Sequence, residues 1–272
     1  MVRSLNSGVS GIQQFQGKLD VIGNNIANSN TLGFKSGRAD FEDSFSQSLS
    51  GGTTNYQVGS GVATSTVRSL FNQGTLSRTM VPTDMAVEGD GFFIVRDPVS
   101  GNTFATRAGA FDIDSQGYLV TSDGYRVQGY QDAGLATRGD LRIDDSGKPA
   151  GDTGEYKRFN VDTEGRINVA LTTGTTFVRG QILLQRFQNP NALVKEGGNL
   201  YTAMDAAGPL SQSEAAKTNG LGQIVSGYLE MSNVDIANEF TSMITTQRGF
   251  QASARIITTT DEMLQEVVNL KR

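Results

Sequence analysis

The sequence predicts an α+β protein with a helix at each end and a β-rich domain between them. Three observations lead to this prediction: apolar residues recur every seven positions near both ends, they alternate with polar residues in the middle, and glycine is abundant, with 33 of 272 residues. A period of seven is typical of helices that pack lengthwise against other helices. A period of two is typical of strands with one buried face, and glycine serves the turns between strands.

The first predicted helix lies within residues 1–30 and carries two apolar rows on one face. Side chains seven apart, together with those three or four apart, meet along one seam of a helix. Such a seam needs a partner, so we expect this face at a contact between helices and subunits. The residues expected there are Leu5, Val9, Ile12, Phe15, Leu19, Ile22 and Ile26.

The second predicted helix lies within residues 233–272 and repeats the heptad spacing. Asn233 or Asp235 could cap its first turn. Two helices alone cannot enclose their apolar seams, so we predict a coiled-coil-like pair completed by neighbouring copies of the chain. Core packing within one helical domain is the alternative. The residues expected at the subunit contact are Ile236, Phe240, Met243, Phe250, Ile257, Leu264 and Val268.

Asparagines cluster where the first helix should end. Asn24, Asn25 and Asn28 lie close together there, and asparagine competes with its own backbone for hydrogen bonds, which tends to end helices. The same amides could also bridge to adjacent subunits. The two interpretations are compatible, so all three asparagines belong to the predicted interface.

The middle of the chain is predicted to be an extended connector followed by a β-rich outer domain. Residues 31–75 are polar and rich in Gly, Ser and Thr, so we expect a connector with a few short strands. Within residues 76–232, the run FDIDSQGYL at 111–119 matches FNVDTEGRI at 159–167, and LRIDDSG at 141–147 echoes both. Each copy leads from a strand into an Asp-x-x-Gly turn, which predicts β-hairpins.

The composition excludes most catalytic chemistry. Histidine and cysteine are both absent, which removes Ser-His-Asp and Cys-His catalysis, zinc sites built from these residues and disulfides. The formal net charge is −5 without blocks of either sign, which argues against binding of a nucleic-acid backbone. No stretch approaches the ~18 apolar residues of a membrane span, and the first residues lack the apolar core of a cleavable signal peptide.

Two short motifs resemble ligand sites. The spacing of five residues superficially matches a calcium loop, but its last position is Asp instead of Glu and its flanks are strand-like, so a plain hairpin is expected. The run GDG at 89–91 opens a strand instead of following one, so it is no dinucleotide fingerprint. We therefore predict no metal, no cofactor and no catalytic residue. The five residues whose spacing superficially matches a calcium loop are Asp112, Asp114, Gln116, Gly117 and Asp123.

Several longer motifs occur in order along nearly the whole chain. The N-terminal part reads LDVIGNNIAN at 19–28 and TLGFK at 31–35, the middle reads DMAVEGDGFF at 84–93 and TRAGAF at 106–111, and the C-terminal part reads GYLEMSNVD at 227–235. Together they resemble the signatures of bacterial flagellar rod and hook axial proteins.

The resemblance implies a helical homopolymer in the flagellum, with the terminal helices forming an inner tube around an export channel and the β domain outside. It implies export by the flagellar type III apparatus without signal cleavage. A hook subunit would transmit torque and would have the distal rod protein, the hook cap and the hook–filament junction proteins as further partners. No nucleic acid, membrane insertion or enzymatic activity is implied.

Within the family, the chain most resembles a short hook protein. The runs RVQGY at 126–130 and VVNLKR at 267–272 look hook-like, whereas the length resembles the distal rod protein, which is the alternative. Outside the family, one alternative is a secreted, β-rich, adhesin-like binding protein whose end helices pair within one monomer. Another is a carboxylate hydrolase, although no acidic pair stands out.

Overall fold

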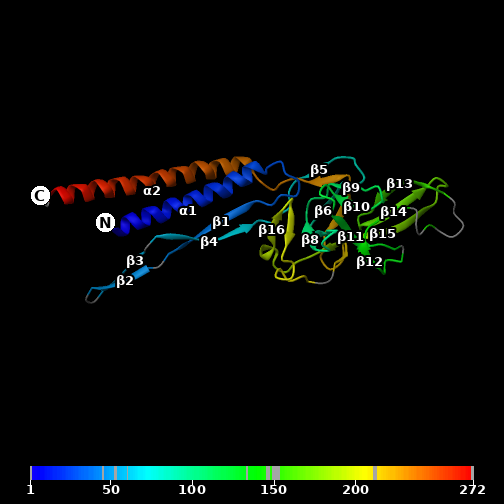
Figure 1. Ribbon diagram of the computed structural model, residues 1–272, viewed down its shortest axis with the longest axis horizontal. Coiled ribbons are helices and arrows are strands. Elements are labelled where there is room, and N and C mark those ends of the chain that lie inside the picture. The colour runs from blue at the N-terminus through cyan, green and yellow to red at the C-terminus, as the bar shows by residue number, and fades with distance from the viewer. Residues whose placement is uncertain are drawn as a thin grey trace. The chain divides into compact units, whose positions relative to one another are not determined.

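The computed structural model has a long helix at each end of the chain and strands between them (Figure 1). It describes residues 2–44, 46–51, 54–59, 61–132, 134–144, 148, 154–210 and 213–270. Helix α1 spans Val2–Ala27 and helix α2 spans Ile236–Leu270. The predicted α+β class, with terminal helices and a central β-rich region, is confirmed.

The chain forms two compact units. The helical unit contains residues 1–29, 35–70 and 234–272, and the β unit contains residues 30–34 and 71–233. Each unit is therefore built from segments that are distant in the sequence.

Helices α1 and α2 lie side by side and antiparallel in the helical unit (Figure 1). Two glycines bring the backbones close together: a Cβ on Gly8 would lie 3.0 Å from Ile257, and a Cβ on Gly249 would lie 2.7 Å from the ring of Phe15. The second helix begins at an N-cap, where Asp235 Oδ1 accepts hydrogen bonds of 2.9 Å and 3.2 Å from the next backbone N–H groups. Asp235 is one of the two caps that the sequence predicts.

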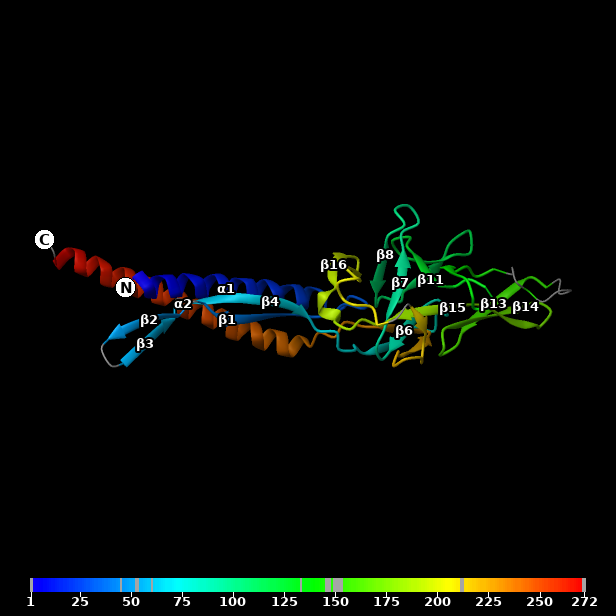
Figure 2. The same ribbon diagram turned by 90° about the horizontal axis from the view of Figure 1, so that it is seen from below.

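A β-hairpin runs beside α1 in the same unit (Figure 2). Strands β1 (Gly37–Asp43) and β4 (Val62–Ser69) pair antiparallel, and β2 (Ser46–Gly51) pairs with β3 (Thr54–Gly59). The rings of Phe15 and Phe41 meet edge to face with centroids 6.4 Å apart. The polar segment that the sequence predicts to be an extended connector thus contributes a strand pair to the helical unit.

An exposed ion pair joins the two long strands of this hairpin. Asp40 lies 2.9 Å from Arg38 and 2.8 Å from Arg68. The hydrogen bond from Arg38 lowers the pKa of Asp40 below its ordinary value. Both arginine side chains are more than half exposed, so the pairs contribute little to stability.

The β unit is built around one large sheet. Its main path has the order β13-β14-β15-β11-β7-β8-β17-β16, with short strands β9, β10, β12 and β18 beside it, while β5 pairs with β20 and β6 pairs with β19. The strands of the main path are β13 (Tyr156–Val161), β14 (Arg166–Leu171), β15 (Thr176–Gln185), β11 (Arg126–Tyr130), β7 (Phe92–Arg96), β8 (Thr103–Thr106), β17 (Leu200–Thr202) and β16 (Val194–Gly197). The others are β9 (Phe111–Ile113), β10 (Leu119–Thr121), β12 (Arg138–Asp140), β18 (Glu214–Ala215), β5 (Leu76–Arg78), β20 (Tyr228–Glu230), β6 (Met85–Glu88) and β19 (Gln223–Ser226). A 3-10 turn covers Pro190–Ala192.

Two of the three predicted hairpins are present. The turn between β9 and β10 is closed by a 2.7 Å bond from Gly117 N to Asp114 O, and the turn between β13 and β14 by a 2.8 Å bond from Gly165 N to Asp162 O. Both glycines have positive φ, 84° and 80°, as the Asp-x-x-Gly pattern requires. The third copy runs into residues 145–147, which lie outside the described part of the chain.

The sheet carries apolar side chains on both faces. Along β7, Phe93 and Val95 belong to the main core, whereas Phe92 and Ile94 belong to a second cluster with Phe187. Alternate residues of a strand point to opposite faces, so these two clusters cover opposite sides of the sheet. A strand buried on both faces explains why the run at 92–95 lacks polar alternation.

A buried ion pair anchors the points where the chain enters and leaves the β unit. The carboxylate of Glu230 is completely buried and lies 3.5 Å from Arg107, whose side chain is 4% exposed. Its other oxygen accepts a 2.9 Å hydrogen bond from Gly74 N, and its backbone carbonyl accepts one of 2.8 Å from Gly33 N. One residue therefore holds three separate segments of the unit together.

Candidate functional site

The face of α2 that meets α1 alternates large apolar and small polar side chains. Thr246, Ser253 and Thr260 are buried, with 2%, 9% and 2% of their surface exposed. Each is seven residues from the next, and a Cβ on Gly11 of α1 would lie 3.1 Å from the Ser253 hydroxyl. Four predicted residues alternate with these three along the same face and are partly buried: Met243, Phe250, Ile257 and Leu264.

The predicted apolar face of α1 is largely covered within the subunit. Ile22 is buried at 4% exposure, whereas Val9 is 39% exposed. The hairpin and α2 cover much of this face, so only part of it is available to another molecule. The partly buried members are Leu5, Ile12, Phe15, Leu19 and Ile26.

Outside this face, α2 exposes two groups of apolar side chains. The N-terminal patch contains Ile236, Phe240 and Ile244, which are 44%, 50% and 52% exposed. The C-terminal patch contains four residues that are 47%, 50%, 50% and 86% exposed, in the order Ile256, Met263, Val267 and Leu270. Exposed apolar side chains concentrated on one helix are typical of an interaction surface.

The sequence pattern identifies only part of these patches. It predicts Ile236 and Phe240, and also Val268, which is 65% exposed, but it omits Ile244 and the whole C-terminal patch. A second spacing carries the missing signal, because residues 236, 240 and 244, and residues 263 and 267, follow one another at intervals of four. The heptad rows make this spacing hard to recognise, because Ile236 and Phe240 belong both to those rows and to the series with an interval of four.

Asn25 connects three elements of the helical unit. It is 1% exposed, and its Nδ2 donates to Gly37 O at 2.8 Å and to Glu239 Oε1 at 3.0 Å. Its Oδ1 accepts a 2.8 Å hydrogen bond from Gly37 N. The side chain of Asn28 instead donates to Asn24 at the helix end, at 2.9 Å and 2.8 Å. Asn25 therefore makes its bonds within the subunit, while Asn24 is exposed.

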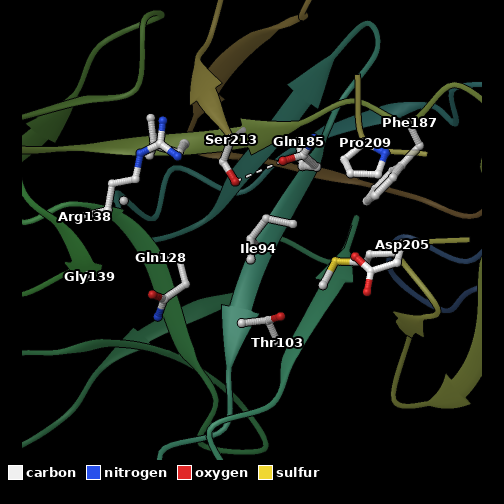
Figure 3. Close-up of a pocket in the computed structure, with 13 residues that line it drawn as sticks. Ile94, Thr103, Gln128, Arg138, Gly139, Gln185, Phe187, Asp205, Pro209 and Ser213 are labelled. Atoms are coloured by element: carbon white, nitrogen blue, oxygen red, sulfur yellow. Dashed lines mark hydrogen bonds between the residues drawn. The ribbon is translucent and has the colours of Figure 1, made fainter. Parts of the chain in front are cut away.

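A cavity of about 290 Å³ lies on the second face of the large sheet (Figure 3). Ile94 and Leu183 supply apolar lining, and the rim includes the Ser213 hydroxyl, which donates a 3.1 Å hydrogen bond to Gln185 Oε1. Gln128 points toward the cavity from β11 (Figure 3). The lining contains one carboxylate, Asp205, so it offers no pair of acidic groups for hydrolysis.

Asp140, beside this cavity, is held by two arginines and an amide. Its oxygens lie 3.1 Å from Arg96, 3.0 Å from Arg126 and 2.7 Å from Gln128. Burial alone would raise the pKa of the Asp140 carboxyl, but the hydrogen bonds from Gln128 and Arg126 outweigh it and lower the pKa below its ordinary value. This arrangement favours the charged form of a carboxylate that ties β11 to β7 and β12.

Two features of the described residues concern the requirements of a metal site and of a membrane-spanning helix. In that part of the chain, no group of three or more potential metal ligands is gathered at one place. Neither of the long helices described combines the length and apolar character that crossing a membrane requires. Two long terminal helices, one of them with uncovered apolar patches, and a separate β unit are the features that a protein class has to account for.

Comparison with known proteins assigns the family. Residues 5–35 match the flagella basal body rod protein model, residues 86–169 match the flagellar hook protein FlgE/F/G D1 domain, and residues 225–270 match the flagellar basal body rod FlgEFG protein C-terminal model. The chain belongs to the family of bacterial flagellar rod and hook proteins. It is therefore a structural component of the flagellum, and the prediction that it is not an enzyme is confirmed by its family.

The relatives include rod and hook proteins. The chain is 41% identical to the flagellar basal-body rod protein FlgG of Bacillus subtilis over 281 aligned residues, which cover 100% of both chains. It is 36% identical to the FlgG of Caulobacter vibrioides, over 99% of this chain and 100% of the relative. It is 28% identical to the flagellar hook protein FlgE of Borreliella burgdorferi, in an alignment of 444 positions covering 100% of both.

Proposed function

We propose that this chain is a subunit of the flagellar rod that polymerises helically into a hollow tube. The supporting observation is the match in length with proteins named as rod subunits: 281 aligned residues for a chain of 272. The alignment with the hook relative spans 444 positions, so it must contain long gaps in this chain.

In this proposal, the terminal regions 1–30 and 233–272 form the inner tube and residues 76–232 form the outer domain. Residues 31–75 connect them. The inner tube surrounds the channel through which the flagellar type III apparatus exports subunits, and the chain itself leaves the cell by that route without signal cleavage.

The two exposed patches of α2 provide the driving force for polymerisation. Half-exposed side chains of this size each leave on the order of 100 Å² uncovered. Seven of them therefore offer roughly 700 Å² of apolar surface, and at ~25 cal/mol per Å² its burial would contribute on the order of 17 kcal/mol before the entropic cost of association. Hydrophobic burial of this size supports assembly through the ends of the chain.

A truncation tests the polymerisation. The full chain should form fibres at high concentration, whereas a chain lacking residues 236–272 should remain dispersed, because it has lost both patches. Electron microscopy and sedimentation measure the difference. Fibres formed by the truncated chain would refute assembly through α2.

A hook subunit is the second candidate. Sequence analysis favours it through residues 126–130, which form β11, and the hook protein of Borreliella burgdorferi matches over its whole length. Imaging of basal bodies from cells that lack the gene separates the two candidates. Loss of the distal half of the rod identifies a rod subunit, whereas a complete rod without a hook identifies a hook subunit.

A further inference from the structure

The two patches of α2 share one spacing. Met263 follows Ile236 by 27 residues, and Val267 follows Phe240 by the same interval. A helix rises ~1.5 Å per residue, so the two patches are about 40 Å apart along the helix. If one copy of α2 is shifted along its axis by this distance, Ile236 of that copy lies at the same height as Met263 of the other copy. Phe240 and Val267 are brought together in the same way.

The same interval places the patches on opposite sides of the helix. With ~3.6 residues per turn, 27 residues make about seven and a half turns. On each of these sides, α2 carries polar residues outside the patch, so each side of the helix is apolar at one end only. On the side of the N-terminal patch, Gln247 and Gln251 follow Ile244, and on the side of the C-terminal patch, Asn238 and Thr245 precede Ile256.

Opposite sides are what a contact between identically oriented copies requires. When one helix is translated relative to another, the right side of one copy touches the left side of the next. Most of both patches lies outside the face that meets α1, which includes Ser253 and Ile257. Ile256 is the exception at the edge of the C-terminal patch, because a Cβ on Gly8 of α1 would lie 3.7 Å from its side chain. A neighbour could thus approach each patch without displacing α1.

We propose that the N-terminal patch of α2 in one copy packs against the C-terminal patch of α2 in the next copy, in parallel orientation and with a stagger of 27 residues. This inference rests on the proposed function, because it assumes that copies of the chain polymerise. It adds which surfaces meet and at what axial shift. Because the contact joins two different surfaces, it does not close on itself and can repeat indefinitely.

The area of the patches favours a second copy in a polymer over a free dimer. The roughly 700 Å² of apolar surface on the two patches is below the ~1,200 Å² that a stable, specific pair of proteins buries. One such contact is therefore too small to hold two chains together. Repetition of the contact along a tube, together with lateral neighbours, supplies the remaining area.

The charges beside the patches predict how the contact responds to salt. Glu262 follows Asp235, and Glu266 follows Glu239, by the same 27 residues. The proposed stagger thus brings acidic residues to the same level on the two helices. Glu239 accepts a hydrogen bond from Asn25 of α1, so the repulsion acts at a distance and not by direct contact, and it opposes the apolar contact weakly. Added salt screens this repulsion and should increase assembly, whereas a contact made of ion pairs would weaken.

Cysteine cross-linking tests the stagger directly, because the sequence contains no cysteine. The full-length double variant Phe240→Cys with Val267→Cys places two thiols about 40 Å apart in one chain. A disulfide joins residues whose Cα atoms are within ~7 Å, so any bond must link two chains. Oxidation of assembled fibres should produce a ladder of covalent multimers on a non-reducing gel, and each single variant should produce none.

The matched control is Gln251→Cys with Val267→Cys. Gln251 lies on the same side of α2 as Phe240, but its interval to Val267 is 16 residues, so it should not form a ladder. An equally strong ladder from the control, or oxidised fibres of the first variant without a ladder, would overturn the stagger. In that case the fibres themselves would leave the proposed function standing, whereas absence of fibres from the unmodified chain would remove the function.

A second pair covers the case in which the first variant fails to assemble. Ile236→Cys with Met263→Cys has the same stagger and should give the same ladder. If both pairs abolish fibres while the Gln251 control assembles, the paired positions are required for polymerisation, which supports the contact. If the second pair assembles without a ladder, the proposal is wrong.

Discussion

Replacement of Asn25 should loosen the helical unit as a whole. The side chain is 1% exposed and makes three hydrogen bonds, two with Gly37 of β1 and one with the carboxylate of Glu239 in α2. A neutral hydrogen bond contributes ~1 kcal/mol and one to a charged group ~1.5–3 kcal/mol. Because Gly37 and Glu239 are only partly buried and can recover water, Asn25→Ala should lower the free energy of unfolding by about 3 kcal/mol.

The change should appear in the helical signal of the full chain. Among the described residues, α-helix occurs only in α1 and α2, which both belong to the helical unit, so far-UV circular dichroism reports on that unit. A loss of ~3 kcal/mol in a unit of this size should lower its melting temperature by about 14 °C. Asn24→Ala is the matched control, because Asn24 is exposed and interacts with Asn28 at the helix end, so it should change the free energy by less than ~1 kcal/mol.

A charge variant tests the same arrangement more sharply. Asn25→Asp removes the donor that faces Glu239 and places two carboxylates about as close as the present 3.0 Å bond. At neutral pH this variant should be less stable than Asn25→Ala. It should recover in acid, and the recovery should begin above the ordinary carboxyl value of ~4, because two adjacent carboxylates favour uptake of a shared proton. Equal melting temperatures for the Asn24 and Asn25 alanine variants, or an aspartate variant as stable as the original chain, would refute the reasoning.

Further predictions concern both units. Gly17→Ala should stabilise α1 by up to ~1 kcal/mol in a thermal melt, because nothing lies within 4 Å of the added Cβ, whereas Gly249→Ala should destabilise the helix pair, because its Cβ would lie 2.7 Å from the Phe15 ring. Asp140→Asn should lower the stability of the β unit at neutral pH. Since the folded pKa of Asp140 is lowered, its contribution is complete above the unfolded value of ~4 and is lost as the pH falls through the folded value, so urea titrations of variant and original chain should converge in acid. Glu230→Gln leaves a buried arginine without its charged partner and should cost about 3–5 kcal/mol in the same titration; an unchanged midpoint would show that the ion pair is dispensable.

Local patterns made the helices and hairpins predictable. The heptad positions of Met243, Phe250 and Ile257 define a stripe along α2 whatever lies opposite, so sequence alone indicates the helix and its inner face. The turns at Gly117 and Gly165 follow from Asp-x-x-Gly, because the positive φ and the aspartate hydrogen bonds are both local requirements.

The hairpin beside α1 was less predictable for a physical reason. Residues 37–69 alternate weakly between polar and apolar, and most of their order comes from pairing β1 with β4 and from contacts with a helix. Polar strands with one anchoring aromatic, Phe41, carry little periodic signal. The sequence could indicate extended backbone there, but not the partner that holds it.

The candidate site was predicted in part because exposure is a property of the folded unit. Sequence analysis selects Ile236 and Phe240 with the heptad rows but omits Ile244, since only the position of α1 decides which side of α2 stays uncovered. Asn25 illustrates the same limit. Its partner Glu239 is 214 residues away, so no local pattern could identify that hydrogen bond. Its role at a subunit contact stays a prediction.

The division of the helical unit among distant segments bears on the order in which the chain can fold. The β unit can complete itself once residue 233 is available, but α1 has no helical partner until α2 has been synthesised. A ribosome produces α1 first and α2 last, so the part of α1 that packs against α2 stays uncovered through the synthesis of more than 200 residues, whereas the β1–β4 hairpin can cover the remainder earlier. Closure of such a distant pair is intrinsically slow. In a nascent or unfolded chain, the N-terminal segment therefore stays accessible to other molecules until α2 has been synthesised and packs against it.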